Sequence, residues 1–174
     1  PFGALGAEQK ASDQIAGGHV FIAGHGNQRL AQLVRHVFDE AGLATAGGAF
    51  EEDRNLLGRM INVMNHRGPD QKGMFIDKNI SIAATRLSII DIEKGKQPIH
   101  NEDSSLWLVF NGEIYNYREL REVLIGKGHR FYTESDTEAI IHSYEEWGAN
   151  CLSRFNGMFA FAIYDSAKKE LFLA

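Results

Sequence analysis

The sequence contains the stretch Gly157-Met158-Phe159-Ala160-Phe161-Ala162-Ile163-Tyr164, in which nearly every residue is apolar on both alternating faces. Successive side chains of a β-strand point to opposite faces of its sheet, so this pattern predicts a strand that is covered on both sides. Glu170 to Ala174 follows after a short turn and is expected to form its partner strand. Such strands need a layer against each face, and we therefore expect stacked sheets covered by helices.

Other segments supply the remaining layers. Ile80 to Ile92 and Leu106 to Phe110 are rich in branched and aromatic residues and are predicted to be strands. Asp53 to Asn65 carries apolar residues at helical spacing, and a second such helix is expected to begin at Asp136 and end at Gly148. Another helix is predicted after Asn116, with its cap completed by a glutamate three residues later.

The first 45 residues differ from the remainder, because half of the 18 glycines fall within residues 1–50. We place a boundary near Ala44. His19 to Ala23 is expected to be a strand, Gly24-His25-Gly26 a turn, and Asn27 to Ala41 a helix. A glycine turn before a helix could hold a phosphate, but the third glycine of the dinucleotide fingerprint is missing. An ordinary strand-helix unit is therefore the favoured interpretation.

Composition excludes several classes of function. The 174 residues are 44% hydrophobic and 24% charged, as expected for a globular domain, and the net charge of −5 without a basic block argues against binding to nucleic acid. The longest apolar runs are too short to span a membrane. The lone Cys151, interpreted as a small buried hydrophobe, and the absence of a signal-type segment favour a cytoplasmic location.

Several motifs then define a resemblance. Residues 46–174 resemble the glutaminase domain of asparagine synthetases, which are class II glutamine amidotransferases with an N-terminal nucleophile. The resemblance rests on Asn65-His66-Arg67-Gly68-Pro69-Asp70, Arg86-Leu87-Ser88-Ile89-Ile90-Asp91, Gln97-Pro98, Phe110-Asn111-Gly112-Glu113-Ile114-Tyr115-Asn116, Ser135-Asp136-Thr137-Glu138 and Asn156-Gly157-Met158-Phe159-Ala160-Phe161. Because the motifs occur in the family's order, the set is far more specific than any single one.

The resemblance implies a fold and a function. The fold would be α+β, a four-layer αββα sandwich of the N-terminal nucleophile hydrolase type, ending before the synthetase domain to which the family fuses it. The domain would hydrolyse L-glutamine and supply ammonia for ATP-dependent amidation of aspartate or a related acceptor. No cofactor is expected in this domain; ATP and magnesium would belong to the synthetase domain. Residues 1–45 would be either a strand-helix unit or a misread stretch outside the native domain.

The family's functional residues map onto this sequence one by one. Arg86 would hold the α-carboxylate of glutamine, while Glu113 and Asp136 would hold its α-ammonium. Asn111 through its side-chain amide and Gly112 through its backbone N–H would stabilise the oxyanion that forms during hydrolysis. The backbone of Leu87, Ser88, Ile89 and Ile90 would line the same pocket, and His66, Arg67 and Asp70 would support it. We expect no metal site, because His25 and His36 lack partners at ligand spacing.

The nucleophile position departs from the family. In the family a cysteine at the mature N-terminus attacks the amide, and its own α-amino group accepts the thiol proton. Aligning the phenylalanine of the family's opening motif with Phe50 puts Ala44 at that position, with residues 1–43 before it. We consider three explanations. Residues 1–45 are not the native start of an active synthetase, the chain is cleaved before Thr45, or the domain is an inactive glutamine-binding or interaction module.

Overall fold

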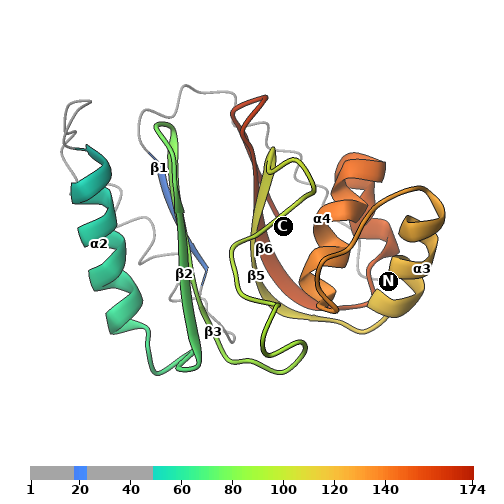
Figure 1. Ribbon diagram of the computed structural model, residues 1–174, viewed down its shortest axis with the longest axis horizontal. Coiled ribbons are helices and arrows are strands. Elements are labelled where there is room, and N and C mark those ends of the chain that lie inside the picture. Colours follow the sequence, from blue (N-terminus) through green and yellow to red (C-terminus); the bar gives the residue numbers. More distant parts are fainter. Residues whose placement is uncertain (1–17, 23–48) are drawn as a thin grey trace, which may run out of the picture.

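The computed structural model describes residues 18–22 and 49–174 (Figure 1). The helices are α2 (Ala49–Val63), α3 (Tyr117–Gly126), α4 (Asp136–Trp147) and the 3₁₀ helix η1 (Gly148–Arg154). The strands are β1 (Gly18–Ile22), β2 (Gln71–Ile76), β3 (Ile80–Arg86), β4 (Ile99–His100), β5 (Leu106–Ile114), β6 (Gly157–Asp165) and β7 (Glu170–Leu173).

Two sheets face each other between helical layers. The first sheet has the strand order β1-β3-β2, and the second has the order β4-β5-β6-β7 with antiparallel neighbours. Figure 1 shows α2 against the outer face of the first sheet, and α3 and α4 against the outer face of the second. The resulting layer order, αββα, confirms the predicted fold class.

Alternate residues of β3 pack into different apolar clusters on the two faces of the first sheet. Ile80, Ile82 and Ala84 belong to one buried cluster with Val109 of β5 and Ala162 of β6, which fills the space between the sheets. The intervening residue Ala83 packs on the opposite side in a cluster with Leu57 and Ile61 of α2 and with Met64, which follows that helix. Helical spacing of these α2 residues thus produces the face that covers the first sheet, as predicted.

The second sheet packs on α3 and α4 with its other face. This apolar cluster contains residues from both the sheet and the helices. The sheet contributes Leu108 and Phe110 of β5 with Phe161 and Ile163 of β6, and the helices contribute Leu120, Leu124, Ile140 and Ile141. Phe161 to Tyr164 is therefore covered on both sides, as the sequence predicts. The beginning of β6 differs from the prediction: Met158 is 71% exposed, because the covered part of the strand begins later.

Two strand predictions need correction, and two strands were not predicted. β3 ends at Arg86 and not at Ile92, and the apolar residues Leu87, Ile89 and Ile92 are exposed on the loop that follows. β5 continues to Ile114, so the motif Asn111-Gly112-Glu113 lies within a strand and not after it. The short β4 and the whole of β2 were not predicted, since neither has a strongly alternating apolar pattern.

The predicted ends of α3 and α4 have different outcomes. Asn116 precedes α3 but makes no side-chain cap; its side chain accepts from the Asn156 N–H and donates to the Arg154 carbonyl, each at 2.9 Å. The expected capping box is therefore wrong, because Asn116 ties the start of α3 to the segment before β6. α4 begins at Asp136 as predicted, and Gly148 with φ 57° follows its last residue.

Two isolated predictions concern other parts of the chain. Cys151 is fully buried in η1, as expected, and burial raises the pKa of its thiol to about 11. The predicted strand near residue 19 is β1, which pairs in parallel with β3 and so joins the first sheet. The predicted turn at 24–26, the helix at 27–41, His25, His36, Ala44 and Thr45 lie outside the described residues.

Within the part of the chain that the structure describes, no helix has both the length and the apolar character required to cross a membrane.

Candidate functional site

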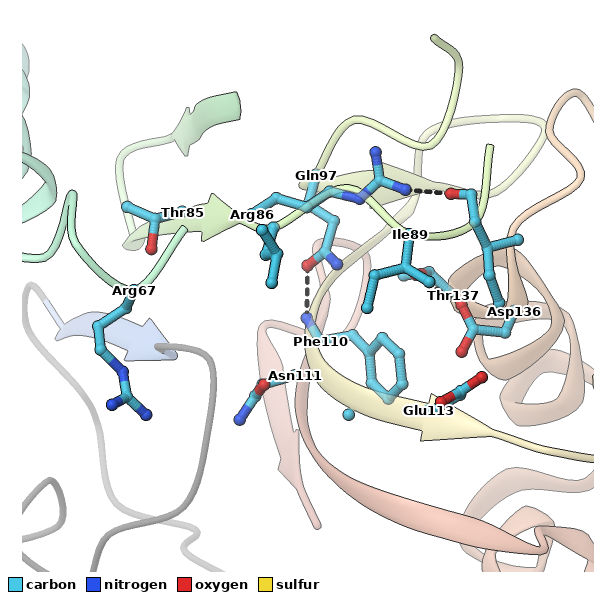
Figure 2. Close-up of a pocket in the computed structure, with 13 residues that line it drawn as sticks. Arg67, Thr85, Arg86, Ile89, Gln97, Phe110, Asn111, Glu113, Asp136 and Thr137 are labelled. Carbon is cyan, nitrogen blue, oxygen red and sulfur yellow. Dashed lines mark hydrogen bonds between the residues drawn. The ribbon is translucent and has the colours of Figure 1, made fainter. Parts of the chain in front are cut away.

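A pocket of about 80 Å³ opens where β3, β5 and the start of α4 meet (Figure 2). Its lining combines two arginines, two carboxylates, two amides, two threonines and apolar residues: Arg67, Thr85, Arg86, Leu87, Ile89, Ile90, Gln97, Phe110, Asn111, Gly112, Glu113, Asp136 and Thr137. Every residue that was assigned a direct role in the site is in this set except Ser88, and of the three supporting residues only Arg67 is in it. The structure therefore brings together residues from five separate sequence motifs.

Ser88 has a different place. Its backbone N–H donates to the Asp70 carboxylate at 2.8 Å, and its hydroxyl lies 3.3 Å from an Arg86 terminal nitrogen. Ser88 therefore helps to hold the loop after β3, and its side chain does not line the pocket. Asp70 and Arg67 were both expected to support the pocket, but they have different places. Asp70 anchors the loop after β3, while Arg67 lines the pocket itself.

Arg86 is buried at the end of β3 and holds the loop that follows it. One of its terminal nitrogens donates to Gln71 Oε1 at 2.8 Å, and the other donates to the backbone carbonyls of Ile90 and Asp91. Burial lowers the pKa of Arg86, whereas the charges of Asp136, Asp91 and Asp70 raise it. An arginine stays protonated under such conditions, so Arg86 is a fixed positive charge beside the pocket.

Asp136 supplies a buried carboxylate at the first residue of α4. Its Oδ2 accepts from the Ile114 N–H at 3.1 Å, and its Oδ1 lies 3.4 Å from the Ser135 hydroxyl. Burial raises the pKa of Asp136, hydrogen bonds from the Ile114 and Thr137 N–H groups lower it, and the charge of Glu113 raises it further. Figure 2 shows the carboxylates of Glu113 and Asp136 on the same side of the pocket.

Asn111 and Gly112 come from the middle of β5, where they pair with Ala160 and Phe159 of β6. The polar head of Asn111 lies across the pocket from Asp136 in Figure 2. Gly112 has φ 137°, a conformation that side chains disfavour. The pocket thus has a cation at the end of β3, a pair of carboxylates on one side and a peptide or amide donor group on the other.

Gln97 is the main site residue that sequence reasoning did not assign. It is buried, and its Oε1 accepts from the Phe110 N–H at 2.7 Å (Figure 2). This contact attaches the loop before β4 to β5 next to Asn111. Thr85, Phe110 and Thr137 were also unassigned, and each is the direct neighbour of a predicted residue. The motif Gln97-Pro98 pointed to this position, but the sequence did not show that Gln97 contacts Phe110, which is 13 residues away.

We expect Gln97→Ala to destabilise the protein by about 1–3 kcal/mol, because the buried Phe110 N–H loses its acceptor. Urea unfolding followed by circular dichroism measures the change. Gln97→Met serves as the matched variant, since it keeps most of the side-chain volume and removes only the acceptor. A Gln97→Met protein as stable as the unmodified chain would show that the hydrogen bond contributes nothing.

This fold and site define a class: an αββα domain with a small charged pocket suited to a zwitterionic ligand. Comparison with known proteins gives the family. The family model described as "Glutamine amidotransferase domain" matches residues 41–174. The chain belongs to this glutamine amidotransferase domain family.

Curated relatives agree with that assignment. The chain is 44% identical over 121 residues to glutamine-hydrolyzing asparagine synthetase 1 of Bacillus subtilis, covering 70% of this chain and 19% of the relative. It is 39% identical over 136 residues to glutamine-hydrolyzing asparagine synthetase 2 of Arabidopsis thaliana, covering 76% and 23%. The chain therefore spans about a fifth of the length of these curated relatives.

A solved structure is also similar in part. It is the glutamine phosphoribosylpyrophosphate amidotransferase of Bacillus subtilis complexed with ADP and GMP, with 30% identity, a TM-score of 0.36 and coverage of 41% of this chain and 18% of that one.

Proposed function

We propose that residues 46–174 form a glutamine-hydrolysing domain of an asparagine synthetase-like enzyme. The observation that carries the proposal is the convergence of Arg86, Glu113, Asp136 and the Asn111-Gly112 pair on one pocket. Free glutamine presents a carboxylate, an ammonium and a side-chain amide, and each has a chemical counterpart among these residues. The pocket is thus matched to the whole amino acid, and not only to its amide.

The two ends of glutamine would be held by opposite charges. A guanidinium is the best partner for a carboxylate, and Arg86 is fixed beside the pocket by its contacts with Gln71 and the following loop. The ammonium would lie between Glu113 and Asp136. Burial of Asp136 disfavours its charged form, and a bound ammonium would offset that cost.

The amide would lie toward β5. Attack on the amide carbon places negative charge on its oxygen, and the Asn111 side-chain amide with the Gly112 N–H would donate to it. Leu87, Ile89 and Ile90 would cover the remaining side of the ligand. The reaction would be an acyl transfer in which a thiolate attacks, ammonia leaves, and water then hydrolyses the glutamyl thioester.

The attacking thiolate is the part that this sequence lacks at the aligned position, which is Ala44. This specific observation favours a second candidate function: a domain that binds glutamine without hydrolysing it, or that serves as an interaction surface. The two candidates share the pocket and differ only in the nucleophile. Binding and turnover must therefore be measured separately.

The rest of the proposed reaction lies outside this domain. A fused synthetase domain would use ATP and magnesium to activate aspartate or a related acceptor, and would receive the ammonia. The curated relatives, of which this chain spans about a fifth, support that assignment through their names. We also propose that the protein acts in the cytoplasm and that no nucleic acid or membrane takes part in the reaction.

We expect L-glutamine to raise the unfolding temperature of the chain, since a ligand that binds only the folded state stabilises it by about 2.7 kcal/mol at 100 times its Kd. Arg86→Ala should weaken this binding by about 1.5–3 kcal/mol, the usual value for a hydrogen bond to a charged group. Differential scanning fluorimetry over a range of glutamine concentrations measures both effects.

Ligand analogues separate the contact from a loss of loop structure. Compared with glutamine, 4-aminobutanamide lacks the carboxylate, and the unmodified chain should bind it more weakly. Arg86→Ala should bind the two compounds about equally. Arg118→Ala, at an exposed arginine of α3, is the control and should retain the preference. If Arg86→Ala keeps the full preference for glutamine, the carboxylate assignment is wrong.

A further inference from the structure

A second cluster of charged side chains lies away from the pocket, beside the C-terminal half of α4. It consists of Glu102, His129, His142 and Glu145, and one candidate ligand atom from each residue lies within 4.8 Å of the others. Glu102 comes from the turn between β4 and β5, His129 follows α3, and the other two are three residues apart on α4. None of the four lines the glutamine pocket.

The distances between these atoms suit a small tetrahedral ion. His142 Nδ1 lies 2.8 Å from Glu145 Oε2 and 3.6 Å from Glu102 Oε2, and His129 Nδ1 lies 3.6 Å from Glu145 Oε2. Bonds of about 2.0–2.2 Å from zinc to imidazole nitrogen and carboxylate oxygen place neighbouring tetrahedral ligands roughly 3.3–3.5 Å apart. These three separations bracket this range, and the other pairs of candidate ligand atoms lie within 4.8 Å of each other.

In both imidazoles a carboxylate lies near the nitrogen that would not bind the ion, although His142 Nε2 makes no hydrogen bond to it. A histidine that binds a metal through one nitrogen generally directs its other N–H at a carboxylate or carbonyl. His142 Nε2 lies 3.5 Å from Glu138 Oε1, and His129 Nε2 lies 3.5 Å from Glu146 Oε2. The Nδ1 atoms of both rings are thereby left facing Glu145.

The carboxylates of the cluster are held as well. Glu102 Oε1 accepts from the Arg130 N–H, and Glu145 Oε1 accepts from the Asn101 amide, each at 2.8 Å. In both glutamates the other oxygen, Oε2, is the one that faces the histidines. Both glutamates are thus held through the oxygen that would not bind the ion, whereas Glu145 Oε2 is hydrogen-bonded to His142 Nδ1 at 2.8 Å, and a bound ion would replace that bond.

Burial indicates a site with an interior wall and an open mouth. The His142 side chain is fully buried, and its Nε2 has no hydrogen-bond partner among the described residues. The His129 side chain is 15% exposed, while those of Glu145 and Glu102 are 23% and 37% exposed. An ion would thus reach the cluster from the glutamate side and meet the buried imidazole last.

We propose that Glu102, His129, His142 and Glu145 form a binding site for a divalent transition-metal ion, with zinc as the best fit. Two imidazoles in a mixed nitrogen and oxygen set favour zinc over magnesium or calcium, which prefer oxygen ligands alone. The ion would join the turn before β5, the segment after α3 and α4. The proposed site differs from the expectation from sequence that the domain has no metal site, which considered only His25 and His36.

The alternative to a bound metal ion is protonation of His142. With zinc absent, an imidazolium at His142 would balance the surrounding carboxylates, and the same geometry would then hold no metal. Metal analysis distinguishes the two occupants directly, because protonation of His142 takes up no ion.

The test starts with the full chain, stripped of metal by a chelator and then dialysed against zinc. We expect one zinc ion per chain, a higher unfolding temperature, and, with cobalt in place of zinc, the strong visible absorption of a four-coordinate site. Absence of zinc uptake by the folded chain would overturn the proposal.

Matched variants locate the ion. Glu102→Gln and His129→Asn remove one ligand each at partly exposed positions, and each should weaken zinc binding by more than roughly 100-fold. Glu146→Gln removes the carboxylate near His129 Nε2, together with its ion pair to Lys127, and should weaken zinc binding by about 10- to 100-fold. Glu122→Gln, at an exposed glutamate of α3 outside the cluster, should bind as the unmodified chain does. Equal binding by Glu102→Gln, His129→Asn and this control would also overturn the proposal.

Discussion

A chain whose free N-terminus is a cysteine at position 44 is expected to release ammonia from L-glutamine, whereas the chain with Ala44 is not. The thiolate would supply the missing nucleophile, and the new α-amino group would accept its proton. Loss of a catalytic nucleophile costs on the order of 10⁶-fold in kcat in a well-studied hydrolase, so the expected gain is of that size.

The variant must preserve β1, since this strand pairs with β3 and precedes residue 44. We therefore suggest Ala44→Cys with a protease recognition sequence placed directly before it, folded intact and then cut. Coupled measurement of ammonia release before and after cutting gives the effect of the free N-terminus. The same cut applied to the chain with Ala44 is the control.

Three outcomes discriminate between the explanations for Ala44. Activity only in the cut cysteine variant means that the pocket is competent and lacks only its nucleophile. Adding Asn111→Ala to that variant should then lower kcat by about 10²- to 10³-fold, the usual effect of losing an oxyanion donor. Activity in the unmodified chain would instead indicate cleavage before Thr45. A folded, cut cysteine variant without activity would contradict the proposed hydrolysis.

Gly112→Ala should cause the largest loss of stability among single changes in the site. Strain of a side chain at φ 137° costs about 1–3 kcal/mol, and steric overlap adds to it. A Cβ at this position would overlap the Met158 carbonyl oxygen and lie 2.6 Å from Phe159 Cα, both on β6. The overlapping atoms belong to the backbone of the paired strand β6 and not to a flexible side chain, so the clash can be relieved only by separating β5 from β6.

Chemical denaturation measures this change, and Gly126→Ala is its matched control. Gly126 lies at the end of α3, and a Cβ there would meet nothing within 4 Å. The control is expected to be neutral or slightly stabilising, because alanine favours a helix over glycine by up to about 1 kcal/mol. A Gly112→Ala protein with the denaturation midpoint of the control would show that β5 tolerates a side chain at this position.

Local patterns predicted the layers because burial on two faces has a direct signature in sequence. Phe161 to Tyr164 is apolar throughout, and no single covering layer could bury it. The same reasoning extended β3 too far, since Leu87, Ile89 and Ile90 look like a strand. There the chain leaves the sheet: Arg86 binds the Ile90 and Asp91 carbonyls, and Asp91 adopts φ 48°. A hydrogen bond from a side chain to the backbone of a later residue leaves no trace in the alternation of apolar and polar residues, so the pattern could not predict where β3 ends.

In the site, too, the sequence could not predict contacts between residues that are far apart along the chain. Motif order assigned Arg86, Asn111, Glu113 and Asp136, and the fold places all four on one pocket. Gln97 was not assigned, because its role depends on a bond to Phe110 that folding alone creates. The histidine cluster was missed for a related reason. Its members come from three segments, and only His142 and Glu145 have a spacing that suggests a shared face.

The buried position of Cys151 makes the nucleophile experiment easier to quantify. It is the only cysteine in the sequence, and its thiol, enclosed in η1 with a pKa raised to about 11, is almost entirely protonated at neutral pH. Thiolates and not thiols react with alkylating agents. In the cut Ala44→Cys variant, an iodoacetamide-type reagent should therefore modify position 44 alone, and the extent of labelling would count the fraction of molecules that carry a competent nucleophile.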